Sequence, residues 1–247
     1  MSATHRPRRA VILAAGNGDR FHAPSHESKL LQPLLGRPIL LRTIASAHAA
    51  GIDHITIVLG YDAPRVRALA ECAASPRLAM TFVVNPLWRL ENGVSAAMAR
   101  EAVGDERFAL LMGDHLFEPA VLARMLDEPL DRDEALLAVD ATPVPRTVAD
   151  EATKVRRRGM RIVAIGKDLR DHDAIDTGVF VCGPSLLDAL EAAQQQDGDT
   201  TLSGGIRRLA QRGLMRAHDI ERAAWCDIDT VDDLAAAESS LAVTDAA

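Results

Sequence analysis

Apolar residues are concentrated in short blocks along this chain, and small or polar residues separate the blocks. Mostly apolar runs of five or six residues lie at 10–15, 55–59, 80–84 and 108–112. Such runs, when Gly or Asn follows directly, are typical of strands buried in a parallel sheet. Stretches with helical composition separate them, at about 36–50, 64–74 and 94–102. This alternation predicts a parallel sheet that is covered by helices.

The second half of the chain has a different pattern of apolar and polar residues. A helix is expected over 116–128 and a strand over 135–140, and short alternating runs around Gly159 then predict an antiparallel hairpin over about 154–166. Another strand follows at 175–181, helices are expected over 184–195 and 204–212, and an extended piece at 224–230 leads into a helix that ends near 240. Thr230 and Asp233 have the spacing of a capping box at its start.

These elements predict an α/β fold with a Rossmann-like mixed, mainly parallel sheet flanked by helices. The 247 residues, 48% of them hydrophobic, are enough for a sizeable core. We expect one domain over 1–247, with flexible ends at 1–8 and 242–247 and a small β-hairpin appendage at about 142–180. No internal repeat or linker divides the chain.

Composition narrows the cellular setting and the class of partner. The formal net charge of −7 argues against a nucleic-acid binder, and the basic cluster Arg6, Arg8 and Arg9 is interpreted as a solvated extension. No apolar stretch approaches the roughly 20 residues that span a bilayer, and the first residues lack a secretory signal. We therefore expect a cytoplasmic protein without direct membrane insertion, in which the scattered cysteines are reduced and have packing roles: Cys72, Cys182 and Cys226.

The loop after the first apolar run has the composition of a polyanion site. Gly16 and Gly18 allow the backbone to approach a ligand closely, and Arg20 and Lys29 can supply charge-assisted hydrogen bonds to phosphate oxygens. The loop lacks the Gly-Lys-Ser/Thr ending of a P-loop and the third glycine of the dinucleotide fingerprint. We interpret it as a nucleotide-phosphate loop of another kind.

Carboxylates occur where a metal ion would accompany these phosphates. Asp114 follows the run at 108–112, and ligands of open α/β sheets bind outside the carboxyl ends of the strands. Asp227 and Asp229 come much later in the chain. Two carboxylates beside phosphates suit Mg²⁺, which is the expected cofactor. Asp227 is favoured as the second ligand and Asp229 is the alternative, because one of the two could instead cap the last helix.

A second loop, at 85–95, runs into a predicted helix. Gly93 and Ser95 lie where the start of a helix directs free backbone N–H groups toward a ligand. A purely structural loop with Ser95 as a helix cap is the competing interpretation.

These motifs resemble those of a known enzyme family. Residues 13–20 with Lys29 resemble the signature of the nucleotidyltransferases that join a nucleoside triphosphate to a phosphorylated sugar or alcohol. The similarity covers nearly the whole chain, and within the family it is greatest to the CTP:inositol-1-phosphate cytidylyltransferases. Asp19 stands where Thr or Ser is usual, and Ser28 where Pro is common; a carboxylate beside a triphosphate is unfavourable unless it turns away or binds metal. The motifs shared with the cytidylyltransferases lie, in order, at 112–115, 151–154, 165–170, 176–178 and 227–230.

The resemblance implies a reaction and roles for residues. It implies Mg²⁺-assisted in-line transfer of CMP from CTP to inositol 1-phosphate, which gives CDP-inositol and pyrophosphate with no covalent enzyme intermediate. Arg20 would hold the β- and γ-phosphates, and Lys29 would stabilise charge at the α-phosphorus. The acceptor would contact Lys167, with Lys154 as a second candidate, and its hydroxyls would contact Asp176 and Thr177. The metal ligands would be Asp114 with Asp227 or Asp229, and the nucleotide-binding residues Leu13, Ala14, Ala15, Gly16, Asn17, Gly18, Asn92, Gly93 and Ser95.

Other interpretations of these motifs stay open. His115 either orients the acceptor or is structural, and Trp225 is interpreted as a core residue. A sugar-1-phosphate nucleotidyltransferase that uses UTP or dTTP, or a phosphocholine-type cytidylyltransferase, is the nearest alternative activity. A non-catalytic nucleotide-binding regulator is disfavoured because Lys29, Asp114 and Asp227 are all present. The expected partners are CTP and a phosphorylated polyol, and a separate membrane CDP-alcohol phosphotransferase would use the product; a homo-oligomer is compatible with the sequence.

Overall fold

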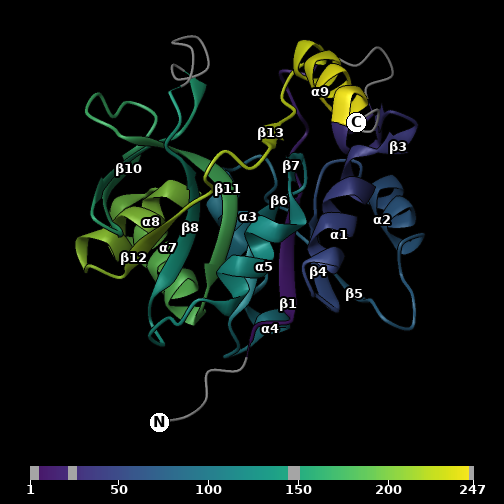
Figure 1. Cartoon of the computed structure of the whole chain (residues 1–247). Helices are drawn as coiled ribbons and strands as arrows, with labels where there is room; N and C mark the ends of the chain where they lie inside the picture. The colour runs from purple at the N-terminus through teal and green to yellow at the C-terminus, as the bar shows by residue number, and fades with distance from the viewer. Residues whose placement is uncertain (1–5, 22–26, 144–150, 245–247) are drawn as a thin grey trace.

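The buried apolar runs come together in one large sheet (Figure 1). The computed structural model describes residues 6–21, 27–143 and 151–244, and within them the sheet has nine strands in the order β5-β4-β1-β6-β11-β8-β12-β10-β9. Four neighbouring strands at one side are parallel to one another, as predicted. They are β1 (Arg9–Ala14), β4 (His54–Leu59), β5 (Ala79–Val84) and β6 (Phe108–Met112).

The other side of the sheet is mixed. β11 (Ala174–Cys182) runs antiparallel to both of its neighbours, β6 and β8 (Ala135–Asp140). β12 (Met215–Asp219) is parallel to β8, and the sequence signals had predicted no strand there. The predicted hairpin exists as β9 (Lys154–Arg158) and β10 (Arg161–Gly166) at the far edge. Of the appendage expected at 142–180, β11 is therefore a central strand, and residues 144–150 lie outside the described part of the chain.

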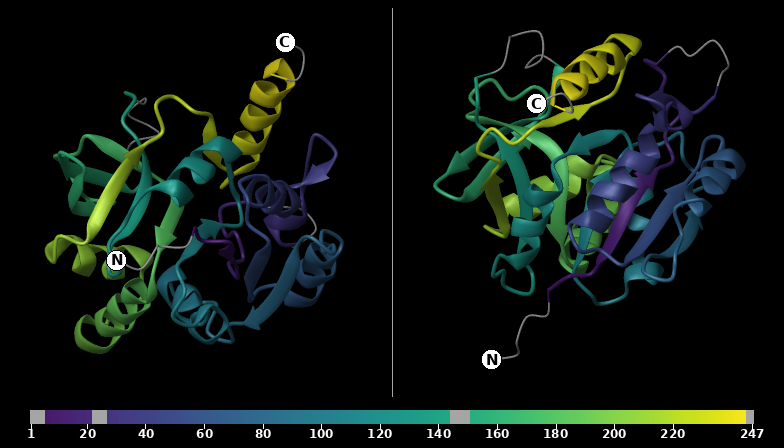
Figure 2. Two further views of the ribbon diagram at one scale, coloured as in Figure 1. Left: turned by 60° about the horizontal axis from the view of Figure 1, so that its bottom comes forward. Right: turned by 45° about the vertical axis from the view of Figure 1, so that its right-hand side comes forward.

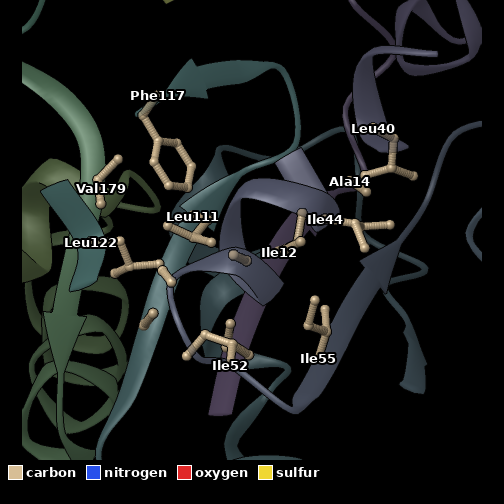
Figure 3. Packing of buried hydrophobic residues seen from close by; sticks show 14 of the residues in the cluster. Ile12, Ala14, Leu40, Ile44, Ile52, Ile55, Leu111, Phe117, Leu122 and Val179 are labelled. Carbon is tan, nitrogen blue, oxygen red and sulfur yellow. The ribbon is translucent and has the colours of Figure 1, made fainter. Parts of the chain in front are cut away.

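Alternation along the strands divides the core into two layers, because successive side chains point to opposite faces. Ile12 and Ala14 of β1 pack on one face with Ile44, Leu111 and Leu122 (Figure 3). The helices that cover this face are α1 (Ile39–Ala49), α2 (Ala63–Glu71) and α5 (Pro119–Asp127).

The opposite face carries the intervening side chains. Val11 and Leu13 of β1 pack there with Phe108, Phe180 and Leu190. The predicted helix at 94–102 is interrupted and forms two short helices. The helices on this face are α3 (Asn92–Ala97), α4 (Arg100–Val103), α7 (Pro184–Asp197) and α8 (Leu202–Gln211).

Short elements complete the end of the molecule where the parallel strands terminate. β7 (His115–Phe117) pairs antiparallel with β13 (Trp225–Asp227), and this pairing sets Asp227 opposite His115. The helix predicted from residue 116 was wrong in its first turn, since α5 begins only at Pro119. The remaining elements are η1 (Lys29–Leu31), β2 (Pro33–Leu34), β3 (Arg37–Pro38) and α9 (Val231–Thr244).

α9 is held at its start and along its length. The Thr230 amide donates to Asp233 Oδ2 at 2.7 Å and the Asp233 amide donates to Thr230 Oγ1 at 3.1 Å, which is the predicted cap. The β2–β3 hairpin lies beside α9 (Figure 2), and the Leu35 amide donates to Glu238 Oε1 at 3.3 Å.

The chain before β1 is folded onto the molecule. Arg6 pairs with Asp127 at 2.9 Å and Arg8 with Asp53 at 2.5 Å, so the basic cluster is not a solvated extension over its described residues. The three cysteines are free thiols. Among the helices of the described residues, none has both the length and the apolar character needed to cross a membrane.

Candidate active site

A cavity of about 1280 Å³ opens at the carboxyl ends of β1 and β6. Its wall comes from segments far apart in sequence, including the phosphate loop, the start of α3, the end of β10 and the β13–α9 connection. The structure thus brings most of the predicted site residues to one place. Those that line the cavity are Leu13, Ala15, Gly16, Asn17, Arg20, Asn92, Ser95, Asp114, Lys167, Asp176, Asp227 and Asp229.

The phosphate loop owes its shape to its glycines. Gly16 has open space around its Cα, whereas Gly18 has a φ of +65° and packs over the Lys29 side chain. A side chain at position 18 would be strained by that φ and crowded by the Lys29 methylenes. Asp19 accepts a hydrogen bond from the Asn17 side chain, although it also lines the cavity.

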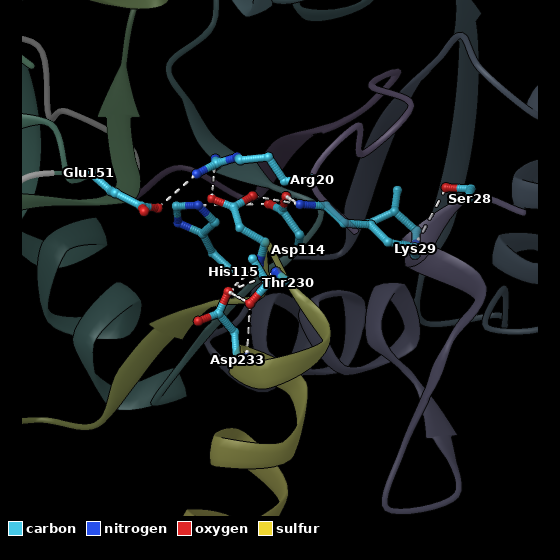
Figure 4. Close-up of polar contacts among 10 residues, drawn as sticks. Arg20, Ser28, Lys29, Asp114, His115, Glu151, Thr230 and Asp233 are labelled. Atoms are coloured by element: carbon cyan, nitrogen blue, oxygen red, sulfur yellow. Dashed lines mark hydrogen bonds and ion pairs between the residues drawn. The ribbon is translucent and has the colours of Figure 1, made fainter. Parts of the chain in front are cut away.

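Lys29 lies beneath the cavity rather than on its wall. It is 8% exposed, and its Nζ lies 2.7 Å from Asp114 Oδ2 and 2.8 Å from Asp229 Oδ1 (Figure 4). Burial would lower the pKa of Lys29, but the two carboxylates outweigh it and raise the pKa above its usual value. Burial likewise opposes ionisation of Asp114, and Lys29 and His115 outweigh it, so the pKa of Asp114 is lowered. Both groups are therefore held in their charged forms.

Arg20 reaches the cavity from the phosphate loop and is paired on both terminal nitrogens. Its Nη1 lies 3.1 Å from Glu151 Oε2, and its Nη2 donates to Asp229 (Figure 4). Asp229 consequently joins the two cations of the predicted triphosphate site. The sequence pattern had offered Asp229 as an alternative metal ligand or helix cap, and Thr230 with Asp233 supply the cap instead.

Asp114 and Asp227 could hold a Mg²⁺ ion if phosphate and water supplied its other ligands. Burial, together with the neighbouring charges of Asp229 and Asp114, raises the pKa of Asp227 against the effect of His115. A divalent cation would relieve this concentration of negative charge. No group of three His, Cys, Asp or Glu side chains within the described ranges forms a ready-made metal site. A pair of carboxylates suffices for Mg²⁺, which takes its other ligands from phosphate and water.

His115 is fixed in the cavity by the 176–178 segment. Its Nδ1 lies 2.8 Å from the Thr177 carbonyl oxygen, and its Nε2 lies 3.7 Å from Asp114 Oδ1. Gly178 makes room for the ring, since a Cβ there would lie 2.2 Å from His115 Nδ1, and its φ is +74°. The Gly178 amide donates to Asp176 Oδ1 at 2.8 Å, while burial raises the pKa of Asp176 to about 6.

Two of the predicted acceptor-binding side chains point elsewhere. Thr177 is 2% exposed, and its hydroxyl donates to the Ala138 carbonyl at 2.9 Å, so it does not face the cavity. Lys154 is 7% exposed and donates to the Lys167 carbonyl at 2.7 Å. Lys167 itself lines the cavity. In this structure both side chains contact neighbouring backbone and neither is directed into the cavity, so their direct contact with the acceptor stays a prediction.

The predicted nucleotide-binding segment at the start of α3 is in part structural. Gly93 is buried so tightly that a Cβ would lie 2.6 Å from the Thr200 carbonyl oxygen. Asn92 Oδ1 accepts from the Leu202 amide at 3.0 Å and Ser95 Oγ accepts from Asn85 at 2.9 Å, although both residues also line the cavity. Two other predicted residues, Ala14 and Gly18, are not on the cavity wall.

Sequence reasoning missed Trp88 and its neighbour Arg89 on the cavity wall. The Arg89 guanidinium lies 4.2 Å from the centre of the Trp88 ring, and the Tyr61 ring lies 5.4 Å from it, centre to centre. Trp88 and Arg89 both line the cavity, as does Leu202 of α8. The available sequence signal for Trp88 was a tryptophan four residues before the 92–95 segment, whereas nothing in the sequence marked Leu202.

Comparison with known proteins identifies similar sequences. Residues 10–217 match the family model of the MobA-like NTP transferase domain. A bifunctional IPC transferase and DIPP synthase of Rubrobacter xylanophilus is 33% identical over 234 residues, which cover 93% of this chain and 51% of that protein. The CMP-5'-(3-aminopropyl)phosphonate synthase of Streptomyces rubellomurinus is 32% identical over 246 residues, 92% of this chain and 38% of that protein. The chain thus spans about half the length, or less, of these curated relatives.

Solved structures agree on the fold. The inositol-1-phosphate CTP transferase from T. maritima superposes with a TM-score of 0.81 at 24% identity, over 96% of this chain and 97% of that one. This likeness confirms the predicted fold class.

Proposed function

The chain belongs to the MobA-like NTP transferase family, and on that basis we propose that it transfers CMP from CTP to inositol 1-phosphate, which releases pyrophosphate. The observation that carries the proposal is the division of one cavity between two kinds of group. Arg20 and Lys29 lie with Asp114 and Asp229 on the side of the phosphate loop. Lys167 enters from the edge hairpin. This arrangement suits two anionic substrates that must be brought together.

The chemistry asks the protein mainly to align and neutralise these anions. Arg20 binds the β- and γ-phosphates, and Lys29 stabilises the charge that develops around the α-phosphorus. Lys167 binds the acceptor phosphate and directs one of its oxygens in line at the α-phosphorus. A bond forms from that oxygen to phosphorus, and the bond to the β-phosphate oxygen breaks, so its electron pair leaves with pyrophosphate. Asp114 and Asp227 would hold Mg²⁺, which would neutralise charge on the phosphates.

Support for the acceptor and base comes from relatives and from the shape of the site. Relatives at about one-third identity are named for IPC transfer or for the synthesis of a CMP-linked phosphonate. Asp176 lines the same cavity as Lys167 and can accept hydrogen bonds from a polyol. Trp88 and the backbone of Leu13 to Gly16 offer a surface for the base. A cytoplasmic location, and use of the product by a separate membrane phosphotransferase, stay predictions.

The test is a pyrophosphate-release assay on the purified chain with Mg²⁺. We expect turnover with CTP and inositol 1-phosphate, and much less when UTP or dTTP replaces CTP or when glucose 1-phosphate, phosphocholine or a phosphonate replaces the acceptor. Turnover only with one of those acceptors would overturn the assignment of the acceptor. Lys29→Ala should abolish most of the activity, and near-normal turnover of this variant would contradict the assigned chemistry.

A further inference from the structure

Glu151 contacts the predicted triphosphate site although no role has been assigned to it. It lies just before β9, and its Oε2 is 3.1 Å from Arg20 Nη1, across 131 positions of sequence. Both side chains line the cavity, and Figure 4 shows the carboxylate directed at the guanidinium. This contact joins the phosphate loop to the strand that begins the edge hairpin.

Two carboxylates contact the Arg20 guanidinium where phosphate oxygens of a nucleotide would bind. Glu151 and Asp229 each occupy one terminal nitrogen of its guanidinium. Carboxylate and phosphate oxygens accept from the same N–H donors of an arginine. Because each terminal nitrogen carries two such donors, a triphosphate that binds Arg20 must either displace one of the two carboxylates or bind against their negative charge.

The two carboxylates differ in how easily they can be replaced. Asp229 has a side chain that is 23% exposed and pairs with Lys29 as well as with Arg20. Glu151 is 72% exposed, and Arg20 is the only ion-pair partner found for it among the described residues. Releasing Glu151 returns its carboxylate to water and breaks one exposed contact, which costs little. Glu151 is thus the carboxylate that a phosphate displaces first.

Resting on the proposed function, we propose that Glu151 is a positioning residue that holds Arg20 over the cavity in the nucleotide-free protein and competes with the β- and γ-phosphates for it. Neutralising Glu151 then tightens binding of any ligand with these phosphates. The gain is confined to such ligands, because a nucleoside monophosphate does not reach Arg20. Tighter binding by the variant distinguishes this role from a merely structural one, because substitution of a structural residue would weaken binding.

The experiment compares Glu151→Gln with the wild type by calorimetric titration in Mg²⁺ buffer. The probes are CTP, inorganic tripolyphosphate and CMP. We expect CTP and tripolyphosphate to bind about 2- to 5-fold more tightly to Glu151→Gln, the range of one exposed ion pair, and CMP to bind equally well to both proteins. The gain should shrink as salt rises from about 0.01 M to 0.15 M, because the screening length falls from about 30 Å to about 8 Å.

Asp232→Asn is the matched control. Asp232 is an exposed carboxylate on the wall of the same cavity, and no contact to Arg20 is found for it. If Asp232→Asn tightens tripolyphosphate binding as much as Glu151→Gln does, the loss of any negative charge near the cavity explains the gain. The proposal is then wrong. The proposal also fails if Glu151→Gln binds CTP equally or more weakly, or binds CMP more tightly by the same factor.

Failure of the proposed function has a different signature. In that case the wild type itself binds neither CTP nor tripolyphosphate. A wild type that binds both, with no gain in Glu151→Gln, rejects only the role of Glu151. Thermal unfolding of each variant checks that the folded state is retained, which the exposure of Glu151 leads us to expect.

Discussion

Lys154 donates its buried ammonium group to the backbone carbonyl of Lys167 at 2.7 Å. The register of the hairpin sets this geometry, because Lys154 pairs with Gly166, the residue before Lys167. One lysine thereby fixes the end of β10 from which the other enters the cavity. The motif lysines at 154 and 167 thus differ: Lys154 supports the backbone, and Lys167 lines the cavity.

Replacing Lys154 should therefore act on the acceptor through Lys167. We expect Lys154→Met to raise the KM for inositol 1-phosphate about tenfold or more, since small displacements of a positioning group are costly, while the KM for CTP changes little. The unpaired carbonyl should also cost about 1–3 kcal/mol of unfolding free energy. Initial rates at varied concentrations of each substrate, with denaturant unfolding alongside, measure both effects.

The control for this variant is Arg158→Met, which removes an exposed cation from the same hairpin. It should leave both KM values nearly unchanged. Equal increases in the two KM values of Lys154→Met would contradict a role exerted through Lys167.

Two constraints favour glycine at position 178: the space that the His115 ring occupies and the positive φ of the backbone. We expect Gly178→Ala to lower the unfolding free energy by about 2–4 kcal/mol, because a Cβ would lie 2.2 Å from His115 Nδ1 at a φ of +74°. Activity should fall as well, since the displaced ring lies among the site carboxylates. Urea unfolding measures the first effect and pyrophosphate release the second.

Gly36→Ala is the control that separates backbone strain at a positive φ from steric overlap with a neighbouring side chain. Gly36 has a φ of +75° and no atom within 4 Å of the added Cβ, so its substitution should cost about 1 kcal/mol, the backbone penalty alone. Adding His115→Ala to Gly178→Ala should recover part of the lost stability through the space it opens. Purely additive effects in the double variant would show that the collision with His115 is unimportant.

Much of the fold follows from local patterns, and the exceptions depend on pairing between distant segments. The strands at 10–15, 55–59 and 108–112 were predicted because each is a mostly apolar run. β12 escaped prediction because Arg216, His218 and Asp219 break any apolar run, and its place depends on β8, some 80 positions earlier. β7 was mistaken for helix because its partner β13 lies more than a hundred residues later.

In the site, the sequence identified the types of residue but not the directions in which their side chains point. Lys154 and Thr177 both belong to motifs that the resemblance connects with the acceptor. Their side chains nevertheless turn to the carbonyls of Lys167 and Ala138. Which face of a strand a residue occupies depends on register and on local bulges, such as the one between Asp176 and Phe180 in β11. No single-sequence pattern contains that information.

Glu134 provides a pH-dependent contribution to stability away from the site. It is 5% exposed, and its carboxylate lies 2.6 Å from Arg161 and accepts from the Asp131 amide at 3.1 Å. Burial alone would raise the pKa of Glu134, but that amide and the nearby arginines, Arg161 and Arg216, outweigh it and lower the pKa below 4.5. A lowered pKa stabilises the folded state above the unfolded value, and this stabilisation is lost as pH falls through the folded value.

Glu134→Gln should consequently be less stable than the wild type at pH 7, by about 1–3 kcal/mol. The difference should shrink as the pH is lowered below about 4.5, where the wild-type carboxyl also becomes neutral. Urea unfolding at a series of pH values measures it, and the exposed neighbour in Asp133→Asn serves as the control. A difference that stays constant with pH would mean that packing, not charge, accounts for the loss.

Substitutions of Asp227 and Asp229 should have different effects on the Mg²⁺ requirement of the reaction. Asp229 is engaged by Lys29 and Arg20, whereas Asp227 lies on β13 opposite His115, with its ionised form destabilised by burial and by the neighbouring carboxylates. We expect Asp227→Asn to raise the Mg²⁺ concentration for half-maximal turnover about tenfold or more. Asp229→Asn should change it less and instead alter the KM for CTP, because it removes one of the two carboxylates that pair with Lys29 and one of the two that pair with Arg20. Electron paramagnetic resonance of Mn²⁺ with CTP gives a binding readout that is independent of turnover. If Asp229→Asn weakens Mn²⁺ binding more than Asp227→Asn does, the metal ligand is Asp229, and Lys29 must leave it when the metal binds.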